Sequence, residues 1–144
     1  VLFSCNYNRV RSPMAEGLFK RFYGTRAFVD SCGLKPDPTG EGVDPFVVVV
    51  MDELGLDVSD HRPKTFAELQ DDSFDVVVSL TPEAQHRAVE LSRDRAVEIE
   101  YWPTHDPTLT DGSREARLEA YREVRDTLAE AIKQRFGAPS TFGG

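Results

Sequence analysis

The sequence has 144 residues, of which 40% are apolar, and this is enough material for one compact domain (1–144) with a single buried core. Its net charge of −8 argues against a general nucleic-acid-binding protein, because such proteins need a basic surface to displace counterions from phosphates. The longest apolar run, 46–51, is far shorter than the roughly 20 residues that span a membrane, and the chain shows no basic and apolar leader; we therefore expect a cytoplasmic protein with no membrane partner.

Strand-like and helix-like segments alternate along the chain. Met14, Leu18 and Phe22 share one face of a helix, and Thr81-Pro82 is a cap with a first-turn proline before a helix that we expect to end near residue 92. Four short apolar runs have the length of strands: 1–4, 27–33, 74–80 and 96–102. A long amphipathic C-terminal helix is predicted by apolar residues spaced three and four apart, namely Leu118, Tyr121, Val124, Leu128, Ile132 and Phe136.

The segment 46–50 is ambiguous, because its valines favour a strand. Asp44-Pro45 before it, however, is a helix cap followed by a first-turn proline, and Gly55 is a fitting helix stop. We predict a helix of about ten residues here. Residues 36–42 read as a loop by their turn chemistry, and 137–144 as a frayed tail.

This alternation predicts an α/β fold in which helices cover both faces of a parallel sheet. Ligands of such folds lie beyond the carboxyl ends of the strands, and the first strand-to-helix turn commonly holds phosphate. Cys5 lies in that turn. The only other cysteine is Cys32, so there is neither a secreted disulfide framework nor a C-x-x-C pair that would indicate a metal or thioredoxin-like site.

The spacing of Cys5 and Arg11 suits attack on a tetrahedral oxyanion. The five residues between them can aim several backbone N–H groups at one point near a helix N-terminus. Arg11 can then bind two oxygens of the anion with its planar guanidinium group. A cationic environment favours the thiolate form of Cys5, and Ser12 can donate its hydroxyl to the sulfur.

The segment Ser4–Phe19, SCNYNRVRSPMAEGLF, resembles the loop of the low-molecular-weight protein tyrosine phosphatase family, C-x-G-N-x-C-R-S-P-x-A-E. Seven positions match: Cys5, Asn8, Arg11, Ser12, Pro13, Ala15 and Glu16. The family also has an Asp-Pro pair near the C-terminus, and Asp106-Pro107 follows the last predicted strand. The resemblance extends over essentially the whole chain, and it implies a three-layer sandwich with a four-stranded parallel sheet of order 2-1-3-4.

The resemblance also implies roles for individual residues. The catalytic residues would be Cys5, Arg11 and Asp106. The phosphate-binding loop would comprise Asn6, Tyr7, Asn8, Arg9, Val10, Arg11 and Ser12, and supporting residues would be Asn8, Ser12, Ser31 and His61. We expect Cys32 to pack in the core at the end of its strand.

Several positions depart from the family pattern. Tyr7 stands in place of a glycine, Val10 in place of a second loop cysteine, and Arg9 at a usually apolar position. Thr108 and Leu109 follow the Asp-Pro pair where many members have tyrosines. A preference for phosphotyrosine therefore does not follow from the resemblance.

These features predict a phosphomonoester hydrolase of the low-molecular-weight tyrosine phosphatase type. It would act on a phosphorylated protein or a small phosphomonoester through a cysteinyl-phosphate, release inorganic phosphate, and need neither a metal nor a cofactor. One alternative is an arsenate reductase of the same fold that is recycled by a small thiol. Another, of a different class, is a phosphate- or phosphopeptide-binding module without catalytic activity.

Overall fold

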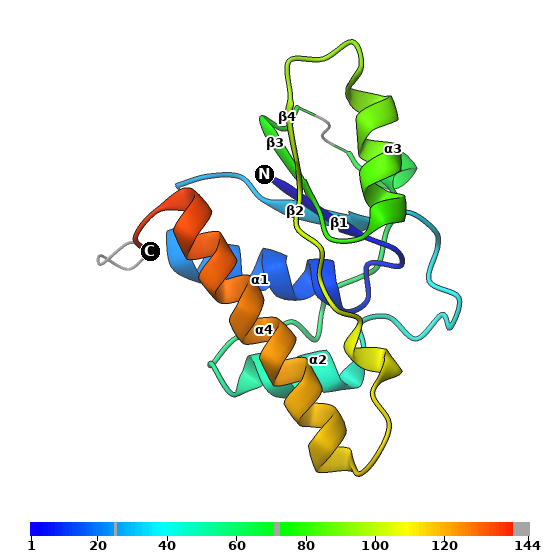
Figure 1. Ribbon diagram of the computed structural model, residues 1–144, viewed down its shortest axis with the longest axis vertical. Coiled ribbons are helices and arrows are strands. Elements are labelled where there is room, and N and C mark those ends of the chain that lie inside the picture. Colours follow the sequence, from blue (N-terminus) through cyan, green and yellow to red (C-terminus); the bar gives the residue numbers. More distant parts are fainter. Residues whose placement is uncertain (25, 71–72, 140–144) are drawn as a thin grey trace.

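The computed structural model describes residues 1–24, 26–70 and 73–139. The elements, in chain order, are β1 (Leu2–Cys5), α1 (Arg11–Tyr23), β2 (Asp30–Gly33), α2 (Pro45–Asp52), the 3-10 turn η1 (Phe66–Glu68), β3 (Val76–Ser79), α3 (Pro82–Ser92), β4 (Glu98–Tyr101), the 3-10 turn η2 (Pro107–Leu109) and α4 (Arg114–Phe136). The strands pair in parallel in the order β2-β1-β3-β4, which confirms the predicted fold (Figure 1). Within the described ranges, no helix has the length and apolar character needed to cross a membrane.

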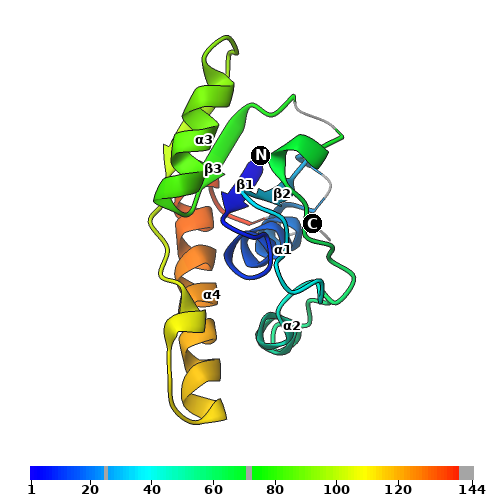
Figure 2. The same cartoon turned by 90° about the vertical axis from the view of Figure 1, so that its right-hand side faces the viewer.

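The side chains of each strand alternate between the two faces of the sheet, and this divides the core into two clusters. Phe3 and Cys5 join the larger cluster, which α1, α2 and α4 complete. Leu2 and Cys32 belong to the smaller cluster, on the side of α3, together with Ala88 of that helix. Figures 1 and 2 show the same division, with α1, α2 and α4 gathered in the lower half of each view and α3 beside the sheet above them.

The ambiguous valine segment forms a helix, as predicted. Asp44 accepts a hydrogen bond from the backbone N–H of Phe46 (2.8 Å), and Pro45 occupies the first turn. Val47 and Val50 are fully buried, and α2 packs against α4. Local capping and burial against a neighbouring helix therefore outweigh the strand propensity of valine.

The strands are shorter than the apolar runs that predicted them. β1 has four residues, and they pair with the four residues of β2, Asp30–Gly33. Before β2, Phe28 is exposed over 59% of its surface, whereas Val29 stays buried in the core although it does not pair. At the other end of the chain α4 stops at Gly137, whose φ is +94°; of the predicted frayed tail, residues 140–144 lie outside the described residues.

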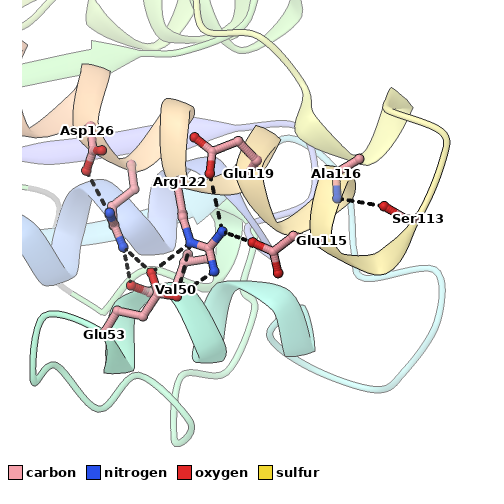
Figure 3. A network of polar contacts seen from close by, with 9 residues as sticks. Val50, Glu53, Ser113, Glu115, Ala116, Glu119, Arg122 and Asp126 are labelled. Atoms are coloured by element: carbon pink, nitrogen blue, oxygen red, sulfur yellow. Dashed lines mark hydrogen bonds and ion pairs between the residues drawn. The ribbon is translucent and has the colours of Figure 1, made fainter.

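An ionic network joins the end of α2 to the middle of α4 (Figure 3). Glu53 accepts hydrogen bonds from Arg125 (2.8 Å) and from two nitrogens of Arg122 (2.9 and 3.1 Å). The buried Arg125 also donates to the carbonyl of Val50 (2.7 Å) and to Asp126 (2.8 Å). The hydrogen bonds from Arg122 are the main cause that lowers the pKa of Glu53, so the carboxylate form is favoured in the folded state.

We expect Arg125→Met to lower the free energy of unfolding by about 1.5–3 kcal/mol, the range for a hydrogen bond to a charged group. Arg122→Met should cost less, because that side chain is more exposed and Arg125 still pairs with Glu53. Because the pKa of Glu53 is lower in the folded state, its contribution is present above the unfolded-state pKa and is lost as the pH falls through the folded-state value. Urea denaturation of the parent and of both variants at pH 7 and pH 4 measures these losses of unfolding free energy. Equal losses for Arg125→Met and Arg122→Met would contradict the larger contribution of Arg125.

Candidate active site

The segment between β1 and α1 curls at the carboxyl end of the sheet. Cys5 is the last residue of β1, Arg11 is the first of α1, and the five residues between them form bends. Asn8 has a φ of +57°, the one positive φ of a non-glycine residue in the described ranges. Asn tolerates this conformation better than most residues do. Tyr7, which replaces a family glycine, therefore adopts an ordinary backbone conformation, and 42% of its surface is exposed.

Cys5 and Ser12 lie in direct contact. The Cys5 Sγ is 2.9 Å from the Ser12 Oγ, and both residues are buried. The Ser12 hydroxyl already accepts a hydrogen bond from the Asn8 amide (2.7 Å), so its own proton is available for donation. The second acceptor within reach, the carbonyl oxygen of Cys32, is farther away at 3.4 Å. The hydroxyl is thus placed to donate to a thiolate at Cys5.

The Asn8 side chain is fully buried, and all of its hydrogen-bonding groups have partners. Its Nδ2 donates to Ser12 and to the Ser31 Oγ (2.9 Å). Its Oδ1 accepts from the backbone N–H of Lys64 (3.1 Å) and lies 3.1 Å from the His61 Nε2. Four segments of the chain therefore meet at this one amide.

Ser31 and His61, which the resemblance names as supporting residues, both contact Asn8. Ser31 extends the hydrogen-bond network to α1, because its hydroxyl donates to the Glu16 carboxylate (2.6 Å). The His61 Nε2 also lies 3.0 Å from the Asn8 carbonyl oxygen; since both nearby Asn8 atoms are acceptors, Nε2 carries the ring proton. Burial lowers the pKa of His61, although the Glu16 carboxylate opposes the shift, so the neutral ring is favoured at neutral pH.

Arg11 and Asp106 meet at the same end of the sheet. Arg11 donates to the carbonyl of Thr104 (3.0 Å), and another of its nitrogens is 4.0 Å from the Asp106 carboxylate. Asp106 caps η2 by accepting from the N–H (3.0 Å) and hydroxyl (2.6 Å) of Thr108. Its side chain is 31% exposed, whereas Cys5 is buried. Leu109, which follows in η2, is 72% exposed.

Two further residues of the loop, Asn6 and Val10, contact parts of the fold outside the loop. The Asn6 side chain accepts from the hydroxyl of Thr81, the cap of α3 (2.7 Å), and its carbonyl accepts from Lys35 (2.9 Å). Val10 packs in the larger core cluster. Sequence reasoning identified Thr81 only as a helix cap, and no local signal connects it with Asn6.

Cys32 has the core role that the sequence predicted. It is fully buried, and burial raises the pKa of its thiol. It pairs in register with Ser4, whereas Cys5 pairs with Gly33. Because neighbouring positions of a strand point to opposite faces, Cys32 and Cys5 are on different sides of the sheet. The two sulfurs are therefore not placed to form a disulfide in this fold.

Gly33 was missed by the sequence analysis as a residue that shapes the loop. A Cβ at this position would lie 2.8 Å from the backbone of both Tyr7 and Asn8. Backbone atoms cannot yield as a flexible side chain can, so any larger residue would push the loop out of place. The end of β2 thus packs directly beneath the loop.

We expect Gly33→Ala to weaken the binding of inorganic phosphate about tenfold or more, because overpacking displaces the loop N–H groups. Cys32→Ala is the matched control, since it changes the adjacent β2 residue on the opposite face and should cost stability without changing phosphate affinity. Calorimetric titration with phosphate and thermal melting separate the two effects. A Gly33→Ala protein that binds phosphate as the parent does would contradict a rigid packing of β2 against the loop.

Comparison with known proteins places this geometry in a family. The model of the low molecular weight phosphotyrosine protein phosphatases matches residues 1–138. The chain is 31% identical to an arsenate reductase of Halalkalibacterium halodurans (92% of this chain, 91% of the relative) and 32% identical to a glutaredoxin arsenate reductase of Synechocystis (92% of each). A solved low molecular weight protein tyrosine phosphatase from T. tengcongensis is 27% identical, with a TM-score of 0.75 over 94% of this chain and 95% of that one. The chain belongs to the low molecular weight phosphotyrosine protein phosphatase family, whose members include both phosphatases and arsenate reductases.

Proposed function

We propose that the protein is a phosphomonoester hydrolase that uses Cys5 as its nucleophile. The contact between Cys5 and Ser12 carries this proposal, because it places a hydroxyl donor on a buried sulfur at the start of a helix. The helix N-terminus and the loop N–H groups favour an anion at this point. A merely structural cysteine has no need of this arrangement, so a non-catalytic phosphate-binding module is the weaker reading.

The reaction would proceed in two displacements. The Cys5 thiolate attacks phosphorus in line with the ester oxygen, while the loop N–H groups and Arg11 hold the other three oxygens. Asp106 protonates the leaving oxygen as the P–O bond breaks. A cysteinyl-phosphate remains, and Asp106, now a carboxylate, takes a proton from the water that attacks it. Inorganic phosphate leaves, and Ser12 stabilises Cys5 as the departing thiolate.

Arsenate reduction is a second candidate, because two relatives at 31% and 32% identity are named arsenate reductases. Arsenate has the shape of phosphate, so Cys5 could attack arsenic and form a sulfur–arsenic bond, while one arsenate oxygen takes a proton from Asp106 and leaves as water. An external thiol would then attack the Cys5 sulfur: a disulfide forms, the sulfur–arsenic bond breaks, and its electron pair stays on arsenic as arsenite. A further external thiol would restore Cys5. Cys32 supplies no electrons in this scheme, because it lies on the other face of the sheet.

The two candidates are separated by assaying one preparation in two ways. Phosphate release from nitrophenyl phosphate and a phosphotyrosyl peptide tests the first; arsenite formation with glutathione and glutaredoxin tests the second. We expect phosphate release that Cys5→Ser abolishes. Arsenite formation without phosphate release would refute the hydrolase and support the reductase, and phosphate binding without either reaction would support the binding module.

Asp106→Asn should lower the turnover of phenyl phosphate by about 10²–10⁴-fold, the usual contribution of a general acid. An activated nitrophenyl ester should lose much less, because its leaving group needs a proton less, and inhibition by phosphate should change little. Steady-state kinetics with a series of leaving groups gives the comparison. Equal losses for good and poor leaving groups would make Asp106 a turn residue only, with Asp111 and His105 as the next candidates for the acid.

Mild peroxide should oxidise Cys5 without joining it to Cys32, because the two thiols occupy opposite faces and Val10 replaces the nearby second cysteine. With glutathione present, Cys5 should instead form a mixed disulfide. Mass spectrometry of the folded monomer distinguishes these products. Finding a Cys5–Cys32 disulfide there would mean that the sheet opens during oxidation.

A further inference from the structure

Arg9 lies in the loop between β1 and α1, termed here the phosphate loop, at a position that is usually apolar in the family. Its side chain contacts residues that follow β2. Its Nε donates to the carbonyl of Gly42 (2.7 Å) and is 3.4 Å from the Asp37 carboxylate. Both charged side chains are largely buried, with 16% and 11% of their surfaces exposed. The guanidinium group of Arg9 is therefore engaged by residues 36–44, termed here the 36–44 loop.

The 36–44 loop is fastened to the phosphate loop at both of its ends. Just before it, Leu34 and Lys35 donate their N–H groups to the carbonyls of Cys5 and Asn6 (2.9 Å each). Where it ends, Asp44 donates its N–H to the carbonyl of Arg9 (3.0 Å). Figure 1 shows this loop, in cyan, running from the carboxyl end of β2 to α2.

Asp37 organises the loop from inside. It accepts from the N–H (2.9 Å) and hydroxyl (2.7 Å) of Thr39, and from the N–H of Gly42 (2.9 Å). These hydrogen bonds, together with the charge of Arg9, outweigh desolvation and lower the pKa of Asp37 to about 2. The carboxylate is thus ionised throughout the physiological range, and Arg9 pairs with it at any working pH.

We propose that Arg9 is a positioning residue that clasps the 36–44 loop to the phosphate loop, so that the loop forms a fixed wall selecting the organic part of the substrate. The wall assignment rests on the proposed hydrolase function. The clasp itself rests only on the contacts of Arg9. The 36–44 loop is joined to the loop that would hold the phosphate through the preceding Leu34 and Lys35 at one end and through Asp44 at the other, so the organic group of a bound phosphomonoester would pass beside this wall.

The clasp can be tested without any assay of activity. A protease specific for glutamate should cut slowly after the exposed Glu41, because the loop is held at both ends. Arg9→Met should accelerate this cut about tenfold, as expected for loss of a hydrogen bond to a charged partner. Asp37→Ala should accelerate it at least as much, and the double variant should be no faster than the faster single variant, because both remove the same interaction.

Arg62→Met is the matched control, since Arg62 is an exposed arginine on a segment that shares a groove with the 36–44 loop. It should leave the cut after Glu41 unchanged. An unchanged rate in Arg9→Met, independent multiplication of the two single effects, or equal acceleration of cuts elsewhere in the chain would each overturn the clasp.

The wall is tested by comparing substrates of different size in Asp37→Ala. The KM for a phosphotyrosyl peptide should rise severalfold or more, with a smaller rise for phenyl phosphate and none in the inhibition constant of inorganic phosphate. An equal rise in all three would overturn the wall, because the loop would then support only the phosphate site. If the parent protein hydrolyses no phosphomonoester, the proposed function fails, and the proteolysis still decides whether Arg9 holds the loop.

Discussion

The site depends on one buried amide, that of Asn8. The loop between β1 and α1 must turn sharply, and Asn8 allows this by taking a positive φ while its side chain makes every hydrogen bond it can. Loss of the Ser12 or the Ser31 hydroxyl would leave one buried N–H of this amide unpaired, which costs about 1–3 kcal/mol. Ser12, Ser31, His61 and Lys64 are therefore held in fixed positions by the requirement to satisfy one side chain. The sulfur of Cys5 obtains its hydroxyl donor from this same network.

Alternation of side chains across β1 and β2 has a chemical consequence as well as a structural one. Phe3 and Cys5 face the large cluster, whereas Leu2 faces the small one beside Cys32. The sheet thus separates the Cys5 thiol from the only other thiol in the chain. In either of the proposed reactions, an oxidised Cys5 would therefore have to be reduced by a molecule from outside the chain.

The features predicted from the sequence are those encoded by neighbouring residues. Asp44-Pro45 carries its own capping information, so the valine helix could be predicted against propensity, and the loop between Cys5 and Arg11 could be located by spacing and resemblance. What could not be predicted depends on approach between distant segments. Gly33 matters because β2 ends beneath Tyr7 and Asn8, and Thr81 because α3 begins beside Asn6. No local pattern records either contact.

The ends of the strands could not be predicted either, because a residue joins a strand only where a neighbouring strand lies beside it to pair with. The apolar run 74–80 supplies seven residues that are suited to a strand, but β3 uses only Val76–Ser79, opposite the short β1 and β4. Arg9 is a further case: its charge in a phosphate loop invites assignment as an anion ligand, and only the fold shows that Asp37 engages it.

The site consists of a buried part, which surrounds the loop between β1 and α1, and a more exposed rim, which carries Asp106. Its cradle is fixed from below by Gly33 and from the sides by Asn8 and Thr81, all buried. The rim carries Asp106, which is a third exposed and touches Arg11 only at 4.0 Å.

A cradle of this kind accepts any tetrahedral oxyanion, so it does not distinguish a phosphate ester from arsenate. The distinction arises after the sulfur has attacked: ester hydrolysis needs a proton donor and then water at the rim, whereas arsenate reduction needs room for an external thiol. If the proposed chemistry holds, the choice between the two reactions therefore depends on η2 and the 36–44 loop, and not on the buried network around Asn8.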